Sequence, residues 1–261
     1  MRKTALITGA SSGLGLDLAR IFAEKGHDLI LIARRQERLK EIKQELLLKN
    51  KLNVEILVKD LSQPGASFEI AQELKSTGVT VDVLVNNAGF GSFGEFVVSD
   101  FSQIHKMMQV NVITAMELCH VFIPEMKKRK SGHILNVASM AAFLPGPLEA
   151  EYFASKACML SFSRSLAYEL RNSGVCVSSF CPGRFRSEFQ ERAFDGSYSQ
   201  ARYRQMPLAS ELVRTAYNGM KKRRTLIIPG LSNRVLYHLH PIIPRSWLNH
   251  IVYWSLLNDV G

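Results

Sequence analysis

The sequence predicts a single doubly wound α/β domain, in which a parallel sheet of about seven strands carries helices on both faces. Short apolar runs alternate with helix-length periodic segments along most of the 261 residues. The runs show little polar alternation, which is typical of parallel strands that are buried on both faces. A glycine-rich turn directly follows the first run. We therefore expect a ligand beyond the carboxyl ends of the strands.

The first half of the chain alternates three strands with three helices. Three apolar runs have the length of strands: TALIT (4–8), DLILIA (28–33) and VEILV (54–58). Apolar residues at helical spacing follow each run. They predict helices from about Leu14 to Lys25, over 36–49 and near 66–76.

The second half continues the alternation. Further strands are expected at VDVLVN (81–86), HILNVAS (133–139), VCVSSF (175–180) and TLIIP (225–229). The helices between them are expected near 100–128, around Tyr152 and over 209–220. No internal repeat or linker-like seam interrupts this order, so one domain should extend from residue 1 to residue 230.

The composition is that of a globular protein. Hydrophobic residues make up 46% and charged residues 21%, which is ample material for a core. No run of 18 apolar residues predicts a membrane-spanning helix, and the N-terminal stretch breaks at Gly9 without the pattern of a signal peptide. The four cysteines lack C-x-x-C spacing, and we expect free, buried thiols in a reducing cytoplasm. They are Cys119, Cys158, Cys176 and Cys181.

The turn after the first strand, TGASSGLG at 8–15, has the features of a phosphate site. Its glycines let the backbone turn sharply and approach a ligand. The helix that starts here presents unpaired N–H groups and a positive dipole end. A plain tight turn is the alternative, but the position between strand and helix favours a dinucleotide site. The expected contacts are Gly9, Ser11, Ser12, Gly13, Leu14 and Gly15.

The end of the second strand indicates which dinucleotide binds. An acidic residue here would accept from the ribose 2′-hydroxyl of NAD, whereas arginine accommodates the 2′-phosphate of NADP. The sequence LILIARRQ places Arg34 and Arg35 at this point, and no acid follows until Glu37. A guanidinium makes paired, charge-assisted bonds to phosphate. The pattern favours NADP, the alternative being that both arginines are ordinary surface residues.

Tyr152 and Lys156 are four residues apart in a segment that predicts a helix, so their side chains share one face. Packing alone explains many such pairs, because a lysine stem covers apolar surface well. The alternative is catalysis. A phenol has a pKa near 10, and a nearby ammonium together with oxidised nicotinamide would lower the pKa toward the working range.

Five motifs occur in the order found in a known enzyme family. They are TGASSGLG at 8–15, NNAG at 86–89, Ser139, YFASK at 152–156 and PG at 182–183. With these motifs the chain resembles the short-chain dehydrogenase/reductase family over roughly residues 3–230. A looser resemblance is to its DltE-like and hydroxysteroid-dehydrogenase-like members. The resemblance implies a Rossmann-type fold and an NADP-dependent oxidoreductase acting on a carbonyl or secondary alcohol.

The resemblance also implies roles for single residues. Tyr152 matches the catalytic acid/base, and Lys156 the residue that binds the nicotinamide ribose and lowers the tyrosine pKa. Ser139 matches the hydroxyl that orients the carbonyl, and Asn111 the asparagine that holds a water for proton relay. Hydride would pass from NADPH while Tyr152 protonates the oxyanion and Ser139 donates to it. No metal is required.

Further cofactor contacts follow from the same motifs. Asn87, Ala88 and Gly89 match the turn beside the adenosine ribose, and Asp60 and Leu61 match the pair that flanks adenine. Ser187 stands where the family usually has threonine. The expected contacts after the sixth strand are Pro182, Gly183, Phe185 and Ser187, with Arg184 and Arg186 as less usual neighbours.

Two segments surround the expected substrate site. Residues 187–206 fall where the family has a mobile lid, and their aromatic residues suit an apolar or bulky carbonyl compound or simply pin the lid to the body. The segment 231–261 is an apolar and basic extension in which Pro241 and Pro244 prevent one continuous helix. We expect the extension to pack on the domain or in a subunit interface. Contact with an anionic membrane is the weaker alternative.

The net charge is +10, and seven basic residues against Asp259 alone lie from residue 212 onward. No nucleic-acid motif accompanies this charge, so nucleic-acid binding is not expected. A non-catalytic protein that senses redox state through bound dinucleotide is the alternative to an enzyme, but it would need none of the four catalytic candidates. The sequence therefore predicts a cytoplasmic, homo-oligomeric (dimeric or tetrameric) NADPH-dependent reductase of a small molecule.

Overall fold

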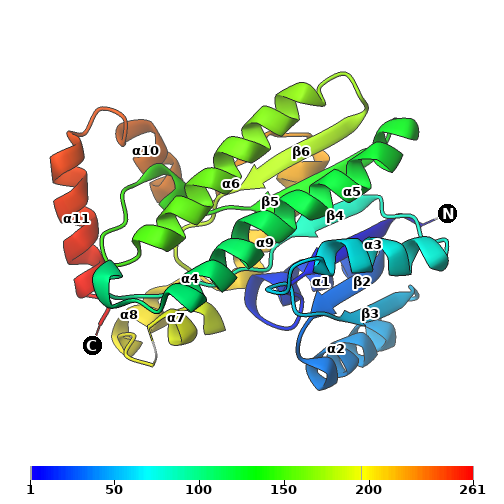
Figure 1. The fold of residues 1–261 in the computed structure, drawn as a ribbon, viewed down its shortest axis with the longest axis horizontal. Coiled ribbons are helices and arrows are strands. Elements are labelled where there is room, and N and C mark those ends of the chain that lie inside the picture. The colour runs from blue at the N-terminus through cyan, green and yellow to red at the C-terminus, as the bar shows by residue number, and fades with distance from the viewer. Residues whose placement is uncertain (1, 195, 261) are drawn as a thin grey trace.

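The computed structural model is a seven-stranded parallel sheet with helices on both faces (Figure 1), which confirms the predicted fold class. It describes residues 2–194 and 196–260. The predicted boundaries at residues 1 and 261, and position 195 of the predicted lid, lie outside the described residues. The strand order is β3-β2-β1-β4-β5-β6-β7. The strands β2 and β3 are added on one side of β1, and β4 to β7 are added on the other side, so the order of addition reverses between β1 and β4. Ligands of such sheets bind at this switch point, beyond the carboxyl ends of the strands.

The strands lie close to their predicted positions. They are β1 (Thr4–Thr8), β2 (Asp28–Ala33), β3 (Val54–Val58), β4 (Val83–Asn86), β5 (Gly132–Val137), β6 (Val175–Phe180) and β7 (Leu226–Ile227). The prediction of a last strand over 225–229 was too long. β7 is an edge strand that pairs with β6 only at Leu226 and Ile227, and Pro229 has no N–H to extend the ladder.

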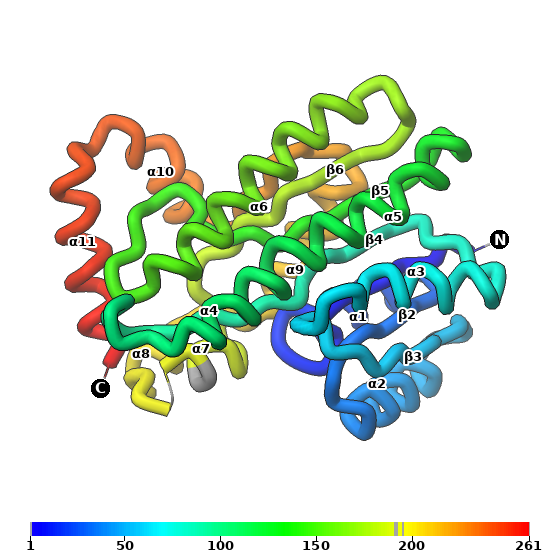
Figure 2. Tube along the Cα trace, in the orientation of Figure 1, coloured from blue at the N-terminus to red at the C-terminus, as the bar shows by residue number. Residues whose placement is uncertain are grey.

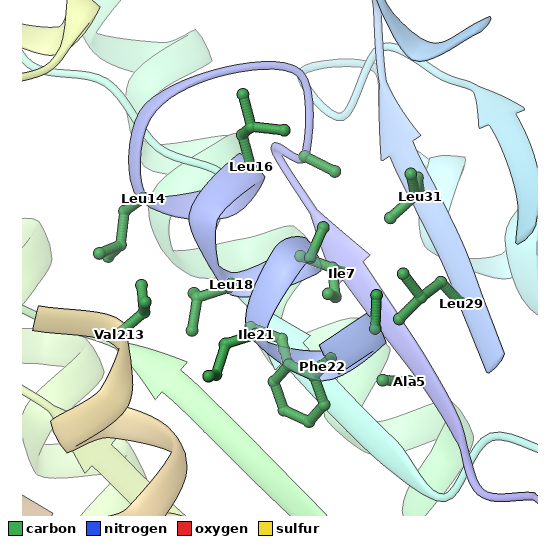
Figure 3. Packing of buried hydrophobic residues seen from close by; sticks show 14 of the residues in the cluster. Ala5, Ile7, Leu14, Leu16, Leu18, Ile21, Phe22, Leu29, Leu31 and Val213 are labelled. Atoms are coloured by element: carbon green, nitrogen blue, oxygen red, sulfur yellow. The ribbon is translucent and has the colours of Figure 1, made fainter. Parts of the chain in front are cut away.

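The helices cover the two faces of the sheet or form the lid and the C-terminal segment. They are α1 (Gly13–Glu24), α2 (Gln36–Lys49), α3 (Ala66–Ser76), α4 (Phe101–Met108), α5 (Thr114–Lys128), α6 (Ala150–Glu169), α7 (Glu188–Ala193), α8 (Gln200–Gln205), α9 (Ala209–Lys221), α10 (Leu231–Leu239) and α11 (Arg245–Leu257). One core contains α1, α2 and α9, and the other contains α3, α5 and α6. Figure 3 shows the first core, where Phe22 and Ile21 of α1 lie near Val213 of α9.

Side chains of the strands alternate between these two cores, as a pleated strand requires. Leu6 and Ile30 belong to the core under α3 and α5, whereas Ile7 and Leu31 belong to the core under α1. The register pairs Leu6 with Ile30 and Ile7 with Leu31, so each face presents aligned apolar rows. This double burial explains why the strands have so little polar alternation in the sequence.

The helix predicted near 100–128 is divided by one π-helical turn at Gln109–Ile113, which carries Asn111. By length and composition, residues 101–128 are also long and apolar enough to span a membrane. They are the one such candidate among the described residues, whereas the sequence predicted none. In the structure this helix covers the sheet through Leu118, Cys119 and Met126. All four cysteines are free, and three of them are buried as predicted, whereas Cys158 is partly exposed.

The C-terminal segment forms two helices, α10 and α11, which Pro241 and Pro244 separate (Figures 1 and 2). Val252 and Leu256 of α11 pack on the lid residues Phe194 and Tyr198. Tyr237 of α10 packs edge-to-face on Phe143. The opposite side of α11 is exposed and includes two tryptophans, Trp247 and Trp254.

Candidate active site

Tyr152 and Lys156 lie on one face of α6, and Ser139 meets them from the end of β5. The ammonium nitrogen of Lys156 is 5.7 Å from the centre of the Tyr152 ring. Lys156 is 5% exposed, and its Nζ donates to the carbonyl oxygen of Val137 at 3.1 Å. The Ser139 hydroxyl lies close enough to the Tyr152 phenol to lower its pKa. Ser139 is fixed in turn because its Oγ accepts from the N–H of Ala141. The three predicted residues are therefore brought together.

Burial dominates the protonation of this group. Burial raises the pKa of Tyr152 well above its ordinary value, and the nearby Glu149 carboxyl adds to that rise, while the nearby Ser139 hydroxyl opposes it. Burial also lowers the pKa of Lys156 to about 8. A lysine that is buried without a carboxylate partner binds its proton weakly. The chain alone therefore leaves the phenol protonated at neutral pH.

Asn111 lies in the π-helical turn between α4 and α5. Its Oδ1 accepts from the N–H of Phe90 at 3.0 Å, and its Nδ2 donates to the Phe90 carbonyl at 2.9 Å and to Ser155 Oγ at 3.1 Å. Single π turns occur frequently at functional sites. Here the turn directs Asn111 toward the loop after β4, and the side chain holds that loop against α6.

The glycine-rich loop fits a pyrophosphate. Gly9 and Gly13 have positive φ angles of 67° and 51°, a conformation that glycine adopts without strain. A Cβ on Gly15 would collide with the carbonyl oxygen of Gly9, and a Cβ on Gly9 would lie 2.9 Å from Ala88 Cα. Ser12 precedes α1 with an extended backbone and no side-chain cap, and Leu14 is buried in the first turn. The loop therefore leaves the first N–H groups of α1 open to an anionic ligand.

The arginines after β2 lie at the same end of the sheet. Arg35 donates from Nε and Nη2 to Ser11 Oγ at 3.3 and 3.2 Å, which ties it to the glycine-rich loop. Arg34 is exposed and close enough to Asp60 to favour the charged carboxylate. Burial raises the pKa of Asp60, but hydrogen bonds from Ser62 and the charge of Arg34 lower it further than burial raises it. The Asp60 carboxyl is therefore an anion at neutral pH. Leu61 beside it is buried.

The loop after β4 packs directly on the glycine-rich loop. The N–H groups of Asn87 and Ala88 both donate to Thr8 Oγ1, at 2.9 and 3.0 Å. Asn87 Nδ2 donates to the carbonyl of Thr8 at 2.9 Å. A Cβ on Gly89 would lie 3.0 Å from Asn111 Oδ1 and 3.3 Å from Lys156 Nζ. Gly89 thus lies directly against the side chains of Asn111 and Lys156.

The segment after β6 passes over the site and enters the lid. The Pro182 carbonyl accepts from the Met140 N–H, and Gly183 lies against the Asn233 side chain. Phe185 packs on the core that contains Leu14. Ser187 caps α7 by accepting from the Phe189 N–H. The Phe189 ring lies 5.2 Å from the Tyr152 ring, so the lid covers the phenol in this structure.

Two buried acidic groups, Glu149 and Asp259, also lie near the site, and no sequence pattern predicted their place there. Glu149, three residues before Tyr152, is buried, and burial raises its pKa to about 8. Asp259 is also buried, and its carboxylate pairs with Arg184 and Arg202. Tertiary packing alone brings Asp259 to this end of the sheet. Among the described residues, no group of three or more His, Cys, Asp or Glu side chains could hold a metal ion.

Comparisons with known proteins agree with this geometry. The family model described as short chain dehydrogenase matches residues 3–197. A short chain dehydrogenase of Pseudocercospora fijiensis is 34% identical over 230 residues, which cover 87% of this chain and 72% of that protein. Dehydrogenase/reductase SDR family protein 7-like of Drosophila melanogaster is 31% identical over 257 residues, which cover 94% of this chain and 78% of that protein.

Solved structures of similar proteins carry the same fold. A short-chain dehydrogenase from Sphingobium yanoikuyae in complex with NADPH has a TM-score of 0.81 at 30% identity, covering 99% of this chain and 96% of that one. The bulky-bulky ketone specific alcohol dehydrogenase from Comamonas testosteroni scores 0.79 at 26% identity, covering 99% and 95%. A Burkholderia phymatum family member in complex with NAD scores 0.79 at 26%, covering 92% and 95%. With the family match over residues 3–197, these likenesses show that the chain belongs to the short-chain dehydrogenase/reductase family of oxidoreductases.

Proposed function

We propose that the protein is an NADP-dependent oxidoreductase that interconverts a bulky, apolar carbonyl compound and its secondary alcohol, with Tyr152 as the acid/base. One observation carries this proposal: Tyr152 lies beside Ser139 and shares a helix face with the buried, carboxylate-free Lys156, whose ammonium nitrogen is 5.7 Å from the centre of the Tyr152 ring. A redox sensor without turnover needs no such arrangement. The family membership supports carbonyl and alcohol redox chemistry in general.

The chain's own groups handle the proton in this reaction. A bound nicotinamide dinucleotide supplies or accepts the hydride. Tyr152 donates its hydroxyl proton to the carbonyl oxygen during reduction and takes it back during oxidation. Ser139 donates to the same oxygen and stabilises its developing charge. The charged form of Lys156 favours the Tyr152 phenolate. The side chain of Asn111 holds the backbone of Phe90, in the loop after β4, in place.

NADP rather than NAD is proposed from the chemistry at the end of β2. Arg34 and Arg35 provide two guanidinium groups at the point where an NAD enzyme has a carboxylate. Asp60 is the nearby acid, and its Oδ1 already accepts from the N–H and the hydroxyl of Ser62. The NADPH complex of the Sphingobium yanoikuyae protein supports this choice, whereas the NAD complex of the Burkholderia phymatum protein shows that similar folds accept either dinucleotide.

The proposed substrate class rests on the aromatic lid. Phe189 lies over Tyr152, and Phe93 stacks on Phe194 with ring centres 4.5 Å apart. Leu144 and Phe153 pack on the same cluster. An apolar rim of this kind selects bulky hydrophobic groups by burial. The Comamonas testosteroni enzyme, named for bulky-bulky ketones, supports the choice by similarity.

The test is NADPH consumption with a panel of aryl and alkyl ketones of increasing size, compared with NADH. We expect turnover that rises with ketone bulk and is faster with NADPH. Tyr152→Phe should abolish turnover at unchanged NADPH affinity, because only the dissociable proton is lost. Arg34→Asp should weaken NADPH more than NADH, by about 1–3 kcal/mol for a lost charge-assisted contact. Full turnover in Tyr152→Phe would refute the acid/base assignment.

A further inference from the structure

The guanidinium of Arg35 is held between the glycine-rich loop and the lid. On one side Nε and Nη2 donate to Ser11 Oγ, and Nη2 also donates to the Ser11 carbonyl at 3.2 Å. On the other side Nη1 lies 3.1 Å from a carboxylate oxygen of Glu188, the first residue of α7. One face of the guanidinium fork is therefore occupied by an anion that belongs to the protein itself.

The same contact fixes the start of the lid against the loop. A Cβ on Gly13 would lie 3.2 Å from Ser187 Cβ, so the residue before Glu188 already touches the glycine-rich turn. Ser187 is buried and donates to Gln190 Oε1 at 2.9 Å, which makes the first turn of α7 a defined unit. Glu188 thus links the start of the lid to Arg35 beside the glycine-rich loop.

We propose that Glu188 is a cofactor-discriminating residue, whose carboxylate competes with the 2′-phosphate of NADP(H) for Arg35. This inference rests on the proposed function, in which the arginines after β2 bind the 2′ end of the cofactor. Carboxylate and phosphate oxygens are equivalent acceptors for a guanidinium fork. An uncharged 2′-hydroxyl is a weaker acceptor and leaves the Arg35–Glu188 pair in place. Binding of the phosphorylated dinucleotide therefore releases Glu188, whereas binding of NAD(H) does not.

The pair is suited to displacement. The side chains of Arg35 and Glu188 are 41% and 43% exposed, and ion pairs this exposed contribute little to stability and are weakened by salt. Arg35 keeps its bonds to Ser11 when Glu188 leaves, so the guanidinium stays in position. The consequence is that Glu188 lowers the affinity for NADP(H) below the value that the arginines alone would give.

The test is the calorimetric dissociation constant of the intact protein for NADP+ and for NAD+. Glu188→Gln should bind NADP+ about three- to tenfold more tightly, as expected for removing one competing charge at a half-exposed site, with NAD+ unchanged. The matched control is Glu37→Gln, which removes an equal charge two residues from Arg35, from a carboxylate that pairs with Lys40 at 2.8 Å. The control should leave the ratio of the two constants unchanged. Unaltered melting temperatures would show that both variants are folded.

A second set of variants separates this inference from the proposed cofactor site. Arg35→Ala should lower the NADP+/NAD+ preference, and Glu188→Gln added to it should have no further effect. If Arg35→Ala lowers the preference but Glu188→Gln in the native background does not raise it, competition is refuted and the cofactor site stands. If neither Arg34→Ala nor Arg35→Ala changes the preference, the cofactor site itself is wrong. Equal tightening of both dinucleotides by Glu188→Gln would refute competition in favour of a general charge effect.

Discussion

The carboxylate of Asp259 lies 2.7 Å from Nη1 of Arg184, although the two residues are 75 positions apart. The same carboxylate lies 3.0 Å from Nη1 of Arg202 in α8. Asp259 is 1% exposed, whereas both arginines retain access to water. One buried charge therefore ties the C-terminal end of the chain to the segment after Pro182 and to the lid. The Ser199 N–H, which donates to the Asp259 carbonyl at 2.7 Å, strengthens this link.

Asp259→Asn is expected to destabilise the protein by about 1–3 kcal/mol, because two guanidinium groups lose their charge-assisted acceptor. The KM for ketone should rise, since the lid is held less firmly, while the dissociation constant for NADPH should stay the same. Urea unfolding and steady-state kinetics measure these effects. The matched control is Glu41→Gln, which breaks the exposed Arg38–Glu41 pair and should change stability by less than about 0.5 kcal/mol. Equal effects of the two substitutions would contradict a structural role for the buried carboxylate.

Gly15→Ala is expected to lose dinucleotide binding, because the added Cβ collides with the Gly9 carbonyl oxygen and deforms the loop. We expect at least a tenfold rise in the dissociation constant for NADPH, or about 1.4 kcal/mol. Gly26→Ala is the control, since Gly26 has a positive φ of 77° but open space around its Cβ position. The control should lose about 1 kcal/mol of stability and retain its affinity. Unchanged binding by Gly15→Ala would show that the loop does not cradle the cofactor.

Lys156→Met tests the cost of the buried ammonium. The folded pKa of Lys156 is about 8, below the ordinary value of 10.5, so the unfolded chain binds the proton more tightly. Between pH 8 and 10.5 the unfolded state holds a proton that the folded state has lost, and stability contributed by this group rises with pH. Below pH 8 the native protein bears the full penalty, at most about 3 kcal/mol.

The variant should therefore be more stable than the native protein at pH 7 in the absence of cofactor, and this advantage should shrink by pH 10. Loss of the hydrogen bond to Val137 offsets part of the gain, by about 1 kcal/mol. Urea unfolding at the two pH values measures the difference. Lys128→Met, at an exposed lysine near the end of α5, should show no such pH dependence. A Lys156→Met variant that is destabilised equally at pH 7 and pH 10 would rule out the buried-charge penalty.

The sequence was sufficient for the sheet and for much of the site because both depend on local pattern. Apolar runs alternating with periodic helices define a parallel sheet, and the carboxyl ends of its strands collect whatever polar residues follow them. Ser139 follows β5 and the glycine-rich turn follows β1, so their approach to α6 and α1 is a consequence of topology. The i, i+4 spacing of Tyr152 and Lys156 places both on one helix face.

Other features depend on contacts that no local pattern encodes. The π-helical turn around Asn111 inserts one residue into a helix whose apolar spacing looks continuous in sequence. The pair of Asp259 with Arg184 forms only when the C-terminal segment docks beside the lid. The contact of Arg35 with Glu188 likewise requires the lid to pack beside the glycine-rich loop. β7 is shorter than its apolar run because an edge strand ends where its pairing partner ends.

The buried carboxyl of Glu149 gives the last prediction, which concerns the pH dependence of catalysis. Glu149 is 6% exposed and precedes Tyr152 by three residues at the start of α6. Burial raises its pKa to about 8, Asp259 and Glu151 add to the rise, and Arg184 opposes it. Its negative charge in turn raises the pKa of Tyr152, because a like charge disfavours the phenolate. Above about pH 8, where Glu149 is charged, formation of the Tyr152 phenolate is therefore hindered.

Glu149→Gln removes this charge and keeps the size of the side chain. The pKa that governs alcohol oxidation should fall by about half a unit to one unit, so the kcat/KM profile for oxidation reaches its plateau at lower pH. The profile for carbonyl reduction should lose activity at correspondingly lower pH, because both limbs report the same phenol. Glu169→Gln is the control, since it removes an equal charge from the exposed far end of the same helix and should leave both profiles in place. A Glu149→Gln enzyme with unshifted profiles would show that the buried carboxyl stays neutral throughout the working pH range, and that Tyr152 is tuned by Ser139 and Lys156 alone.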